Sequence, residues 1–283
     1  MKYYPLIRGR QYDLLALTQM ADTLNPNIIP VLEPVKDIAA LPKLVAAFAK
    51  AKHPLYLIAN PQVGQYGLLD QPKHALPDPL PLPIQAARYY DPLESPLLIT
   101  QTKQQVALLK PKQLAIVPNT ARVRVLHHPL AIYLEDHYPT RARTEDYYQI
   151  QDELYQYPIT ALPGVGFADY PLSTHHYDEH GYPQRAIALH LLYPRQGALW
   201  LHHFVSVNND DYSAPGDKFF EAVSTLKPFL AVHPEATTPA TEALLALDHF
   251  PGLGTLRRLQ LQHWLTIIGR WLAADRTRHS LQN

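Results

Sequence analysis

The chain has 283 residues and a mass of 32.1 kDa, and its composition, 47% hydrophobic and 18% charged, excludes a disordered protein. Its 25 basic residues balance its 25 acidic residues, so it lacks the basic excess with which proteins usually bind a nucleic-acid backbone. The lack of cysteine excludes disulfides, thiolate zinc sites, iron–sulfur clusters and cysteine nucleophiles. We expect a single domain over residues 1–283, because this length is short for two domains.

The amino-terminal residues MKYYPLIRGR contain no apolar run of the length found in a signal peptide. No stretch approaches the ~20 apolar residues that cross a bilayer, because proline, histidine or a charged residue interrupts the apolar runs. We therefore expect a cytoplasmic protein that does not bind membranes.

Short apolar runs recur through the first half of the chain and predict β-strands. They cover residues 3–7, 28–32, 55–59, 96–100, 113–117 and 130–134. They are apolar throughout rather than alternating, which is typical of parallel strands buried on both faces. Segments with helical spacing follow the first two runs, whereas residues 62–83 contain too much proline and glycine for a helix and predict a long loop.

Strand and helix alternate at a spacing of roughly 25 residues, which predicts a parallel sheet. Eight such units would close into a barrel of ~250 residues, so we expect an α/β fold, a TIM-like (β/α)8 barrel that is mainly parallel. A doubly wound open sheet is the alternative.

The last part of the chain has a different pattern. The segment 145–156, preceded by Thr144 as a cap, predicts a helix. Residues 186–194 and 198–206 predict a terminal β-hairpin, one arm of which we expect to be the last barrel strand. Extra carboxy-terminal helices are expected over residues 216–230, 241–250 and 255–274, the last of them buried through its tryptophans.

Polar residues stand where the apolar runs stop, and the carboxyl ends of barrel strands form the mouth in which active sites lie. The alternative is that these residues are solvated loop starts and helix caps. They are Arg8, Arg10, Glu33, Asn60, Gln62, Glu135, Asp136 and Asp169. Because three carboxylates placed together repel, we expect Arg8 within roughly 4 Å of Glu33 or Glu135. We also expect Glu33→Gln to abolish activity while changing stability by less than about 1 kcal/mol.

Two histidines lie in the polar segment 202–211. On a strand, His202 and His203 face opposite ways, so only one of them can point inward. An inward histidine could act as a base or a ligand, or it could be a core residue bonded to a backbone carbonyl. The HHYDEH segment at 175–180 is a weak metal candidate. Arg141 and Arg143 are most simply solvated surface, with phosphate contact as the alternative.

Several strings of the sequence resemble the so-called beta-protein family of phages and bacterial mobile elements. They are YYPLIRGRQYDLLAL, IIPVLEPVK, NPQVG, GVGFADYPL, HFVSVNNDD and GDKFFEAVSTL, and the likeness runs from Tyr4 to about Ile268. The resemblance implies a (β/α) barrel and, for this branch, a gene that stands beside one for a smaller, nuclease-like protein. It implies functional roles for Arg8, Gly9, Arg10, Glu33, Lys36, Asn60, Gln62, Asp169, His203, Ser206, Asn208, Asp210 and Lys218.

Two functions fit these observations. The first is a binding or immunity-type partner of the neighbouring protein in a phage-conflict setting. The alternative is a barrel hydrolase or phosphodiesterase that acts on a phosphorylated or nucleotide-like ligand, with a divalent metal as its candidate cofactor. In that case Arg8 and Arg10 would clamp phosphate, Glu33, Glu135 and Asp169 would hold the ion or act as base, and His203 would transfer a proton. The expected ligand-binding residues are Arg8, Arg10, Lys36, Asn60, Gln62, Ser206, Asn208, Asp210 and Lys218.

Overall fold

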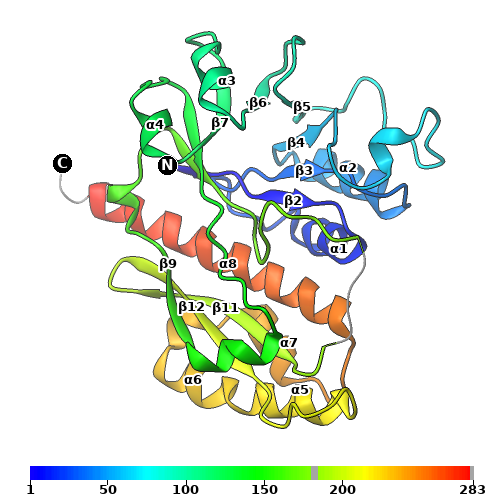
Figure 1. Cartoon of the computed structure of the whole chain (residues 1–283), viewed down its shortest axis with the longest axis vertical. Helices are drawn as coiled ribbons and strands as arrows, with labels where there is room; N and C mark the ends of the chain where they lie inside the picture. The colour runs from blue at the N-terminus through cyan, green and yellow to red at the C-terminus, as the bar shows by residue number, and fades with distance from the viewer. Residues whose placement is uncertain (180–183, 281–283) are drawn as a thin grey trace. The chain divides into compact units, whose positions relative to one another are not determined.

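The computed structural model describes residues 1–179 and 184–280, and its contacts group the chain into two compact units (Figure 1). The first unit contains Met1–His137 and Leu162–Tyr177, and the second contains Tyr138–Ala161 and Asp178–Asn283. Part of the second unit is therefore inserted between two strands of the first. The single domain expected over residues 1–283 stays a prediction, because a grouping of contacts does not decide whether the units fold separately.

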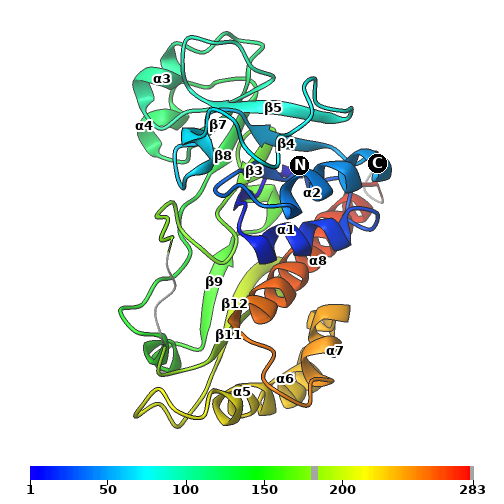
Figure 2. The same cartoon turned by 90° about the vertical axis from the view of Figure 1, so that its right-hand side faces the viewer.

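The first unit contains a large, curled sheet of nine strands that are all paired in parallel, so the α/β class is confirmed. The strands are β1 (Lys2–Tyr3), β2 (Leu6–Arg8), β3 (Val31–Glu33), β4 (Leu55–Ile58), β5 (Ile84–Tyr89), β6 (Leu97–Ile99), β7 (Leu114–Pro118), β8 (Ala131–Leu134) and β10 (Gly166–Ala168). Their order is β1-β10-β8-β7-β6-β5-β4-β3-β2, and Figure 2 shows the neighbouring strands β3 and β4 together. All six apolar runs contain a strand of this sheet.

The segment that holds β1 and β2 has hydrogen-bonded neighbours on both sides. The amides of Tyr4 and Leu6 donate to the carbonyls of Phe167 and Asp169 at 2.8 and 2.9 Å. On the other side, the amide of Ile29 donates to the carbonyl of Tyr3 at 2.8 Å, and that of Val31 donates to the carbonyl of Pro5 at 2.9 Å. Pro5 has no N–H to donate, which interrupts the strand between β1 and β2.

Side chains alternate between the two faces of this sheet. The inner face is an apolar cluster formed by Leu6, Val31, Ile58, Ile116, Ile132 and their neighbours. The outer face of β6, β7 and β8 packs in a second cluster that contains Val106 of α3 and Val123 of α4. The helices of this unit are α1 (Gln11–Met20), α2 (Ala40–Ala51), α3 (Lys103–Ala107) and α4 (Ala121–Arg124), and α1 packs against α2. Residues 62–83 form the expected loop, which contains only the short 3-10 helix Tyr66–Leu68.

The second unit contains a three-stranded antiparallel sheet in the order β11 (Ala188–Arg195), β12 (Ala198–Val205) and β9 (Asp152–Gln156). The predicted hairpin is confirmed, and its turn residues Gln196 and Gly197 have φ of 53° and 81°, as a tight hairpin turn requires. The prediction that one arm is a barrel strand is wrong, because β12 pairs with β11 and β9. The prediction of a helix over residues 145–156 is also wrong. A 3-10 helix (Thr144–Gln149) precedes β9, since pairing with β12 overrides the local helical pattern.

The extra carboxy-terminal helices are confirmed. They are α5 (Pro215–Ser224), α6 (Leu226–Val232), α7 (Pro239–Leu245) and α8 (Leu253–Ser280). Thr238 caps α7 in a capping box with Thr241. Three side chains of α8 bond to the β11–β12 hairpin: Gln260 accepts from the His190 amide at 2.7 Å, His263 bonds the Leu192 carbonyl at 2.7 Å, and Trp271 donates to the Gly197 carbonyl at 2.7 Å.

None of the helices within residues 1–179 and 184–280 has both the length and the apolar character needed to cross a bilayer.

Candidate functional site

A buried ion pair lies at the carboxyl ends of two neighbouring strands of the first unit. Arg8 ends β2, Glu33 ends β3, and the two residues are direct partners in the parallel register. Their side chains form an ion pair in which Arg8 is 8% and Glu33 1% exposed. Both residues follow inner-face positions, Leu6 and Val31, by two residues. The prediction that Arg8 pairs with Glu33 or Glu135 is therefore confirmed, with Glu33 as the partner.

Both oxygens of the Glu33 carboxylate are occupied by donors from this chain. Besides pairing with Arg8, Oε2 accepts from the Tyr89 hydroxyl at 2.7 Å. Oε1 accepts from the backbone amides of Gln62 at 2.6 Å and Val63 at 3.3 Å. Burial raises the pKa of Tyr89 to about 12, so the phenol stays protonated and donates a hydrogen bond to Glu33. A carboxylate with this many donors is a fixed anion rather than a free base or metal ligand.

Arg8 keeps one donor for which the described residues provide no acceptor. Its Nη1 donates to the Tyr89 hydroxyl and its Nη2 to the His175 carbonyl, both at 3.0 Å, and the guanidinium lies over the ring of Tyr170 at 5.2 Å. Within the described part of the chain, no acceptor reaches the buried Nε–H of Arg8. An unpaired buried donor of this kind costs about 1–3 kcal/mol, which a bound acceptor would recover.

Asn60 holds the end of β5 in place. Its side chain donates to the Tyr89 carbonyl at 3.0 Å and to Asp91 at 3.2 Å, and it accepts from the Tyr89 amide at 2.9 Å. Asn60 thereby fixes the position of the phenol that bonds Glu33. Gln62 contributes its backbone amide to Glu33, while its side chain accepts from Gln101 at 3.0 Å.

Two expected site residues at this edge are less central. The guanidinium of Arg10 lies over the ring of Tyr177 at 4.9 Å. Lys36 is half-buried in the segment that follows β3. Their role in ligand binding stays a prediction.

Glu135 and Asp169 do not join Glu33, and the expectation that the three carboxylates gather around one cavity is wrong. Leu134 and Ala168 belong to the inner-face cluster, so the residue after each of them points to the opposite face. Asp169 accepts from the hydroxyl of Tyr3. Glu135 accepts from Asn119 at 2.6 Å and lies 3.0 Å from Nδ1 of His137, whose hydrogen bond lowers the pKa of Glu135.

Two residues of the inner face, Tyr89 and Tyr170, were not among the expected site residues, and Asp136 was named only as a strand-end residue without a role. Tyr89 comes from β5, whose apolar and polar residues mix, so no strand is expected there. Tyr170 follows Ala168 by two residues, and Asp136 follows Leu134 by two. Asp136 forms an ion pair with His175, whose carbonyl bonds Arg8. Side chains alternate between the faces of a strand, so counting two residues on from Leu134 would have predicted Asp136, and not Glu135, on the inner face.

His203 lies on β12 in the antiparallel sheet of the second unit, so the expectation that it extends from a strand of the parallel sheet is wrong. It stands opposite His190 in the β11–β12 register, and the two Nδ1 atoms are 2.6 Å apart. Its Nε2 lies 3.3 Å from the carboxylate of Glu153. A carboxylate can only accept, so His203 carries its proton on Nε2, and His190 donates its Nδ1–H to the bare Nδ1 of His203. His202, on the other face, bonds Asp152 at 2.8 Å.

The remaining expected residues shape the loop between β12 and α5. The Ser206 hydroxyl accepts from the Ile187 amide at 3.0 Å, and the Asn208 amide donates to Glu221 at 3.0 Å. The buried Lys218 donates to the Asp211 carbonyl at 2.5 Å, while Asp210 is exposed. These contacts order the loop, and ligand binding by Ser206, Asn208, Asp210 and Lys218 stays a prediction.

The residues expected to hold a divalent metal do not fit one. Glu33 is occupied by Arg8 and Tyr89, and Glu135 and Asp169 lie on the opposite face of the sheet. Across residues 1–179 and 184–280, no group of three or more His, Asp or Glu side chains is placed to hold a metal ion. In the HHYDEH segment, His175 pairs with Asp136, and His180 lies outside the described residues.

Comparison of the chain with protein-family models, with curated proteins and with solved structures gives no match.

Buried neutral histidines make the second unit sensitive to acid. Burial lowers the pKa of His203 and of His263 to about 4 and holds that of His190 well below its usual value. The unfolded chain, in which histidine titrates near 6.5, therefore binds protons that the folded chain does not. The stability that these groups contribute is present above that pH and is lost as the pH falls from about 6.5 towards about 4. We expect the free energy of unfolding to fall by about 2–4 kcal/mol between about pH 7 and pH 5.

Tryptophan fluorescence during urea unfolding measures this loss, because the chain's 3 tryptophans, at positions 200, 264 and 271, all belong to the second unit. In the variant His263→Gln, roughly a third of the acid-dependent loss should disappear, because His263 is one of three such histidines. An unfolding free energy that stays constant over this pH range would contradict the assignment of these histidines as neutral.

Proposed function

We propose that the protein acts by binding, as a partner or immunity-type protein of the phage and mobile-element family that its sequence resembles. The observation that carries this proposal is the state of the Glu33 carboxylate, which is fully occupied by Arg8, Tyr89 and two backbone amides. This arrangement holds Arg8 in a fixed orientation and leaves its Nε–H without an acceptor among the described residues. A preorganised guanidinium recognises an anion, and the Glu33 carboxylate beside it already accepts from four donors.

The alternative, a metal-assisted hydrolase or phosphodiesterase, has weaker support. Its expected carboxylates, Glu33, Glu135 and Asp169, are distributed over both faces of one sheet. General acid–base catalysis requires these groups within hydrogen-bond reach of one substrate.

We also propose that the curled sheet is a closed, TIM-like barrel. The segment from Lys2 to Arg8 bonds β10 on one side and the segment before β3 on the other, which supports β1 and β2 as two halves of one strand. The nine strands would then form a ring of eight, and Arg8, Glu33 and Tyr89 would lie at its carboxyl-end mouth.

The group that Arg8 recognises is, in this proposal, a carboxylate of the neighbouring nuclease-like protein that the family resemblance implies. The unpaired Nε–H of Arg8 is the donor from which such a carboxylate would accept. The chain's cytoplasmic location belongs to the same proposal.

Co-expression with the protein encoded beside it, followed by size-exclusion chromatography and calorimetric titration, tests the proposal. We expect a complex that Arg8→Lys weakens by about tenfold or more, because lysine keeps the charge but has no Nε–H donor at this position. Arg88→Lys is the matched control. Arg88 is a half-buried arginine of the same unit, paired with Asp91, and its exchange should leave the affinity unchanged. Lack of a complex, or full affinity of Arg8→Lys, would reject the proposal. Metal-dependent phosphodiester hydrolysis that Glu33→Gln abolishes would support the alternative instead.

A further inference from the structure

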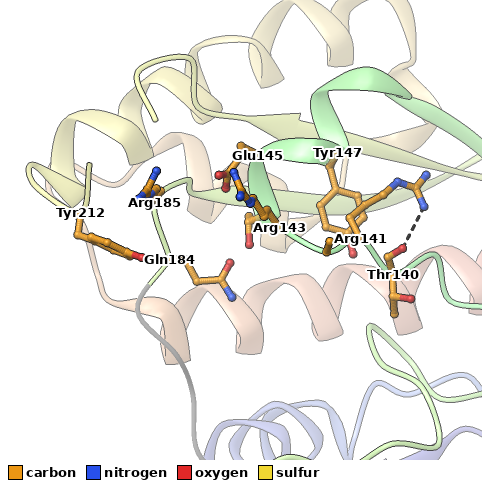
Figure 3. Close-up of a pocket in the computed structure, with 10 residues that line it drawn as sticks. Thr140, Arg141, Arg143, Glu145, Tyr147, Gln184, Arg185 and Tyr212 are labelled. Atoms are coloured by element: carbon orange, nitrogen blue, oxygen red, sulfur yellow. Dashed lines mark hydrogen bonds between the residues drawn. The ribbon is translucent and has the colours of Figure 1, made fainter. Parts of the chain in front are cut away.

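A pocket of about 540 Å³ in the second unit is lined by arginine and tyrosine side chains (Figure 3). The side chains that matter here are Arg141, Arg143, Glu145, Tyr147, Arg185 and Tyr212. We call it the arginine pocket. Its residues come from the segment that leads into β9, from the segment before β11 and from the loop after β12.

The arginine pocket has an excess of positive charge. Three guanidiniums line it and Glu145 is the one carboxylate among the lining residues. Arg141 forms an ion pair with Glu153, which lies outside the lining. Among the residues that the structure describes, no acidic side chain forms an ion pair with Arg143 or Arg185. The charges of these two arginines are therefore available to a ligand.

Part of the pocket is held rigid by packing beneath it. The Arg141 guanidinium lies over the Tyr147 ring at 5.5 Å, and the Tyr147 hydroxyl donates to the Pro139 carbonyl at 2.8 Å. The rings of His190 and His203 lie 4.5 and 4.7 Å from that of Tyr147. A floor of this kind keeps Arg141 in one orientation, which lowers the entropy that binding would otherwise cost.

The opposite part of the pocket offers an aromatic surface. Arg185 lies over the ring of Tyr212 at 5.4 Å, and Tyr212 is 59% exposed. Aromatic rings next to guanidiniums are the surface on which nucleobases stack.

We propose that the arginine pocket binds the phosphate groups of a small phosphorylated molecule, a nucleoside 5′-phosphate being the class that fits best. Guanidinium forks match phosphate oxygens in pairs, and two unpaired arginines beside a third supply the charge of a phosphate dianion. The volume lies in the range of small-molecule pockets. A nucleic-acid polymer fits less well, because the chain as a whole carries no basic excess.

Calorimetric titration of the full chain with inorganic phosphate, pyrophosphate, AMP and ADP tests this inference. We expect ADP to bind more tightly than pyrophosphate, and pyrophosphate more tightly than inorganic phosphate. The double variant Arg143→Gln/Arg185→Gln should weaken ADP binding by about tenfold or more. Glu145→Gln should strengthen it by a few-fold, because the exchange removes the pocket's own competing anion. Since Arg143 and Arg185 are exposed, these variants should fold, which thermal unfolding checks.

Arg195→Gln is the matched control. Arg195 is an exposed arginine of the same unit, stacked over Trp200 at 5.0 Å, and it does not line the pocket. This variant removes one positive charge and should bind ADP within about twofold of the unaltered chain. Equal weakening by Arg195→Gln would show a general charge effect and overturn the inference. The inference would also be overturned if ADP does not bind below about 10 mM, or if a single-stranded oligonucleotide binds more tightly than ADP.

Discussion

Replacing Glu33 with glutamine is expected to lower the free energy of unfolding by about 3–5 kcal/mol. Glutamine keeps the shape of the side chain but loses the charge, so the 8% exposed Arg8 remains as a buried cation without a counter-ion. The sequence predicts a change of less than about 1 kcal/mol, because a residue at a loop start is ordinarily solvated. The expected loss is larger because Glu33 is in fact only 1% exposed. Urea unfolding followed by far-ultraviolet circular dichroism measures it.

Glu94→Gln is the matched control for that experiment. Glu94 pairs with Lys110 in the same unit, but the two side chains are 83% and 76% exposed, so their pair should contribute less than about 1 kcal/mol. If Glu33→Gln and Glu94→Gln change the unfolding free energy equally, the buried pair does not stabilise the sheet edge as described.

Deleting all residues after Leu253 is expected to leave insoluble protein, because α8 supplies much of the core of the second unit. Leu256 and Leu259 belong to the cluster that packs the hairpin against α5 and α7. Trp264 is fully buried, with its ring 4.7 Å from that of Tyr155. The single exchange Trp264→Ala should lower the unfolding free energy by about 3–5 kcal/mol, since it removes a buried indole and leaves a cavity.

Solubility after expression and urea unfolding of Trp264→Ala measure these two effects. Phe220→Ala is the comparison, since Phe220 is an aromatic residue of the same unit that is 41% exposed and should cost about 1 kcal/mol or less. A deletion variant that stays soluble and unfolds cooperatively would show that α8 is an appendage rather than part of the core.

Features that depend on local pattern could be predicted from the sequence. Runs of apolar residues identify six parallel strands, because a strand buried on both faces has no polar alternation. The short spacing around Arg195–Gly197 identifies the hairpin, and Thr238 followed by Pro239 identifies the start of α7. An ion pair of Arg8 with Glu33 or Glu135 also follows, since the carboxyl ends of parallel strands lie at one edge, and the pairing of β2 with β3 selects Glu33.

Features that depend on pairing between distant segments were decided only by the tertiary structure. The sequence does not show which strand β12 pairs with, and its pairing with β9 places His203 in the second unit. The sequence also does not show at which residue each strand ends. A shift of one residue moves every side chain of a strand to the opposite face of the sheet. That is why Glu135 and Asp169 point away from Glu33 while Tyr89 and Asp136 lie on its face. The arginine pocket depends on the same kind of information, because Arg185 and Tyr212 reach Arg143 only through the folding of the hairpin between them.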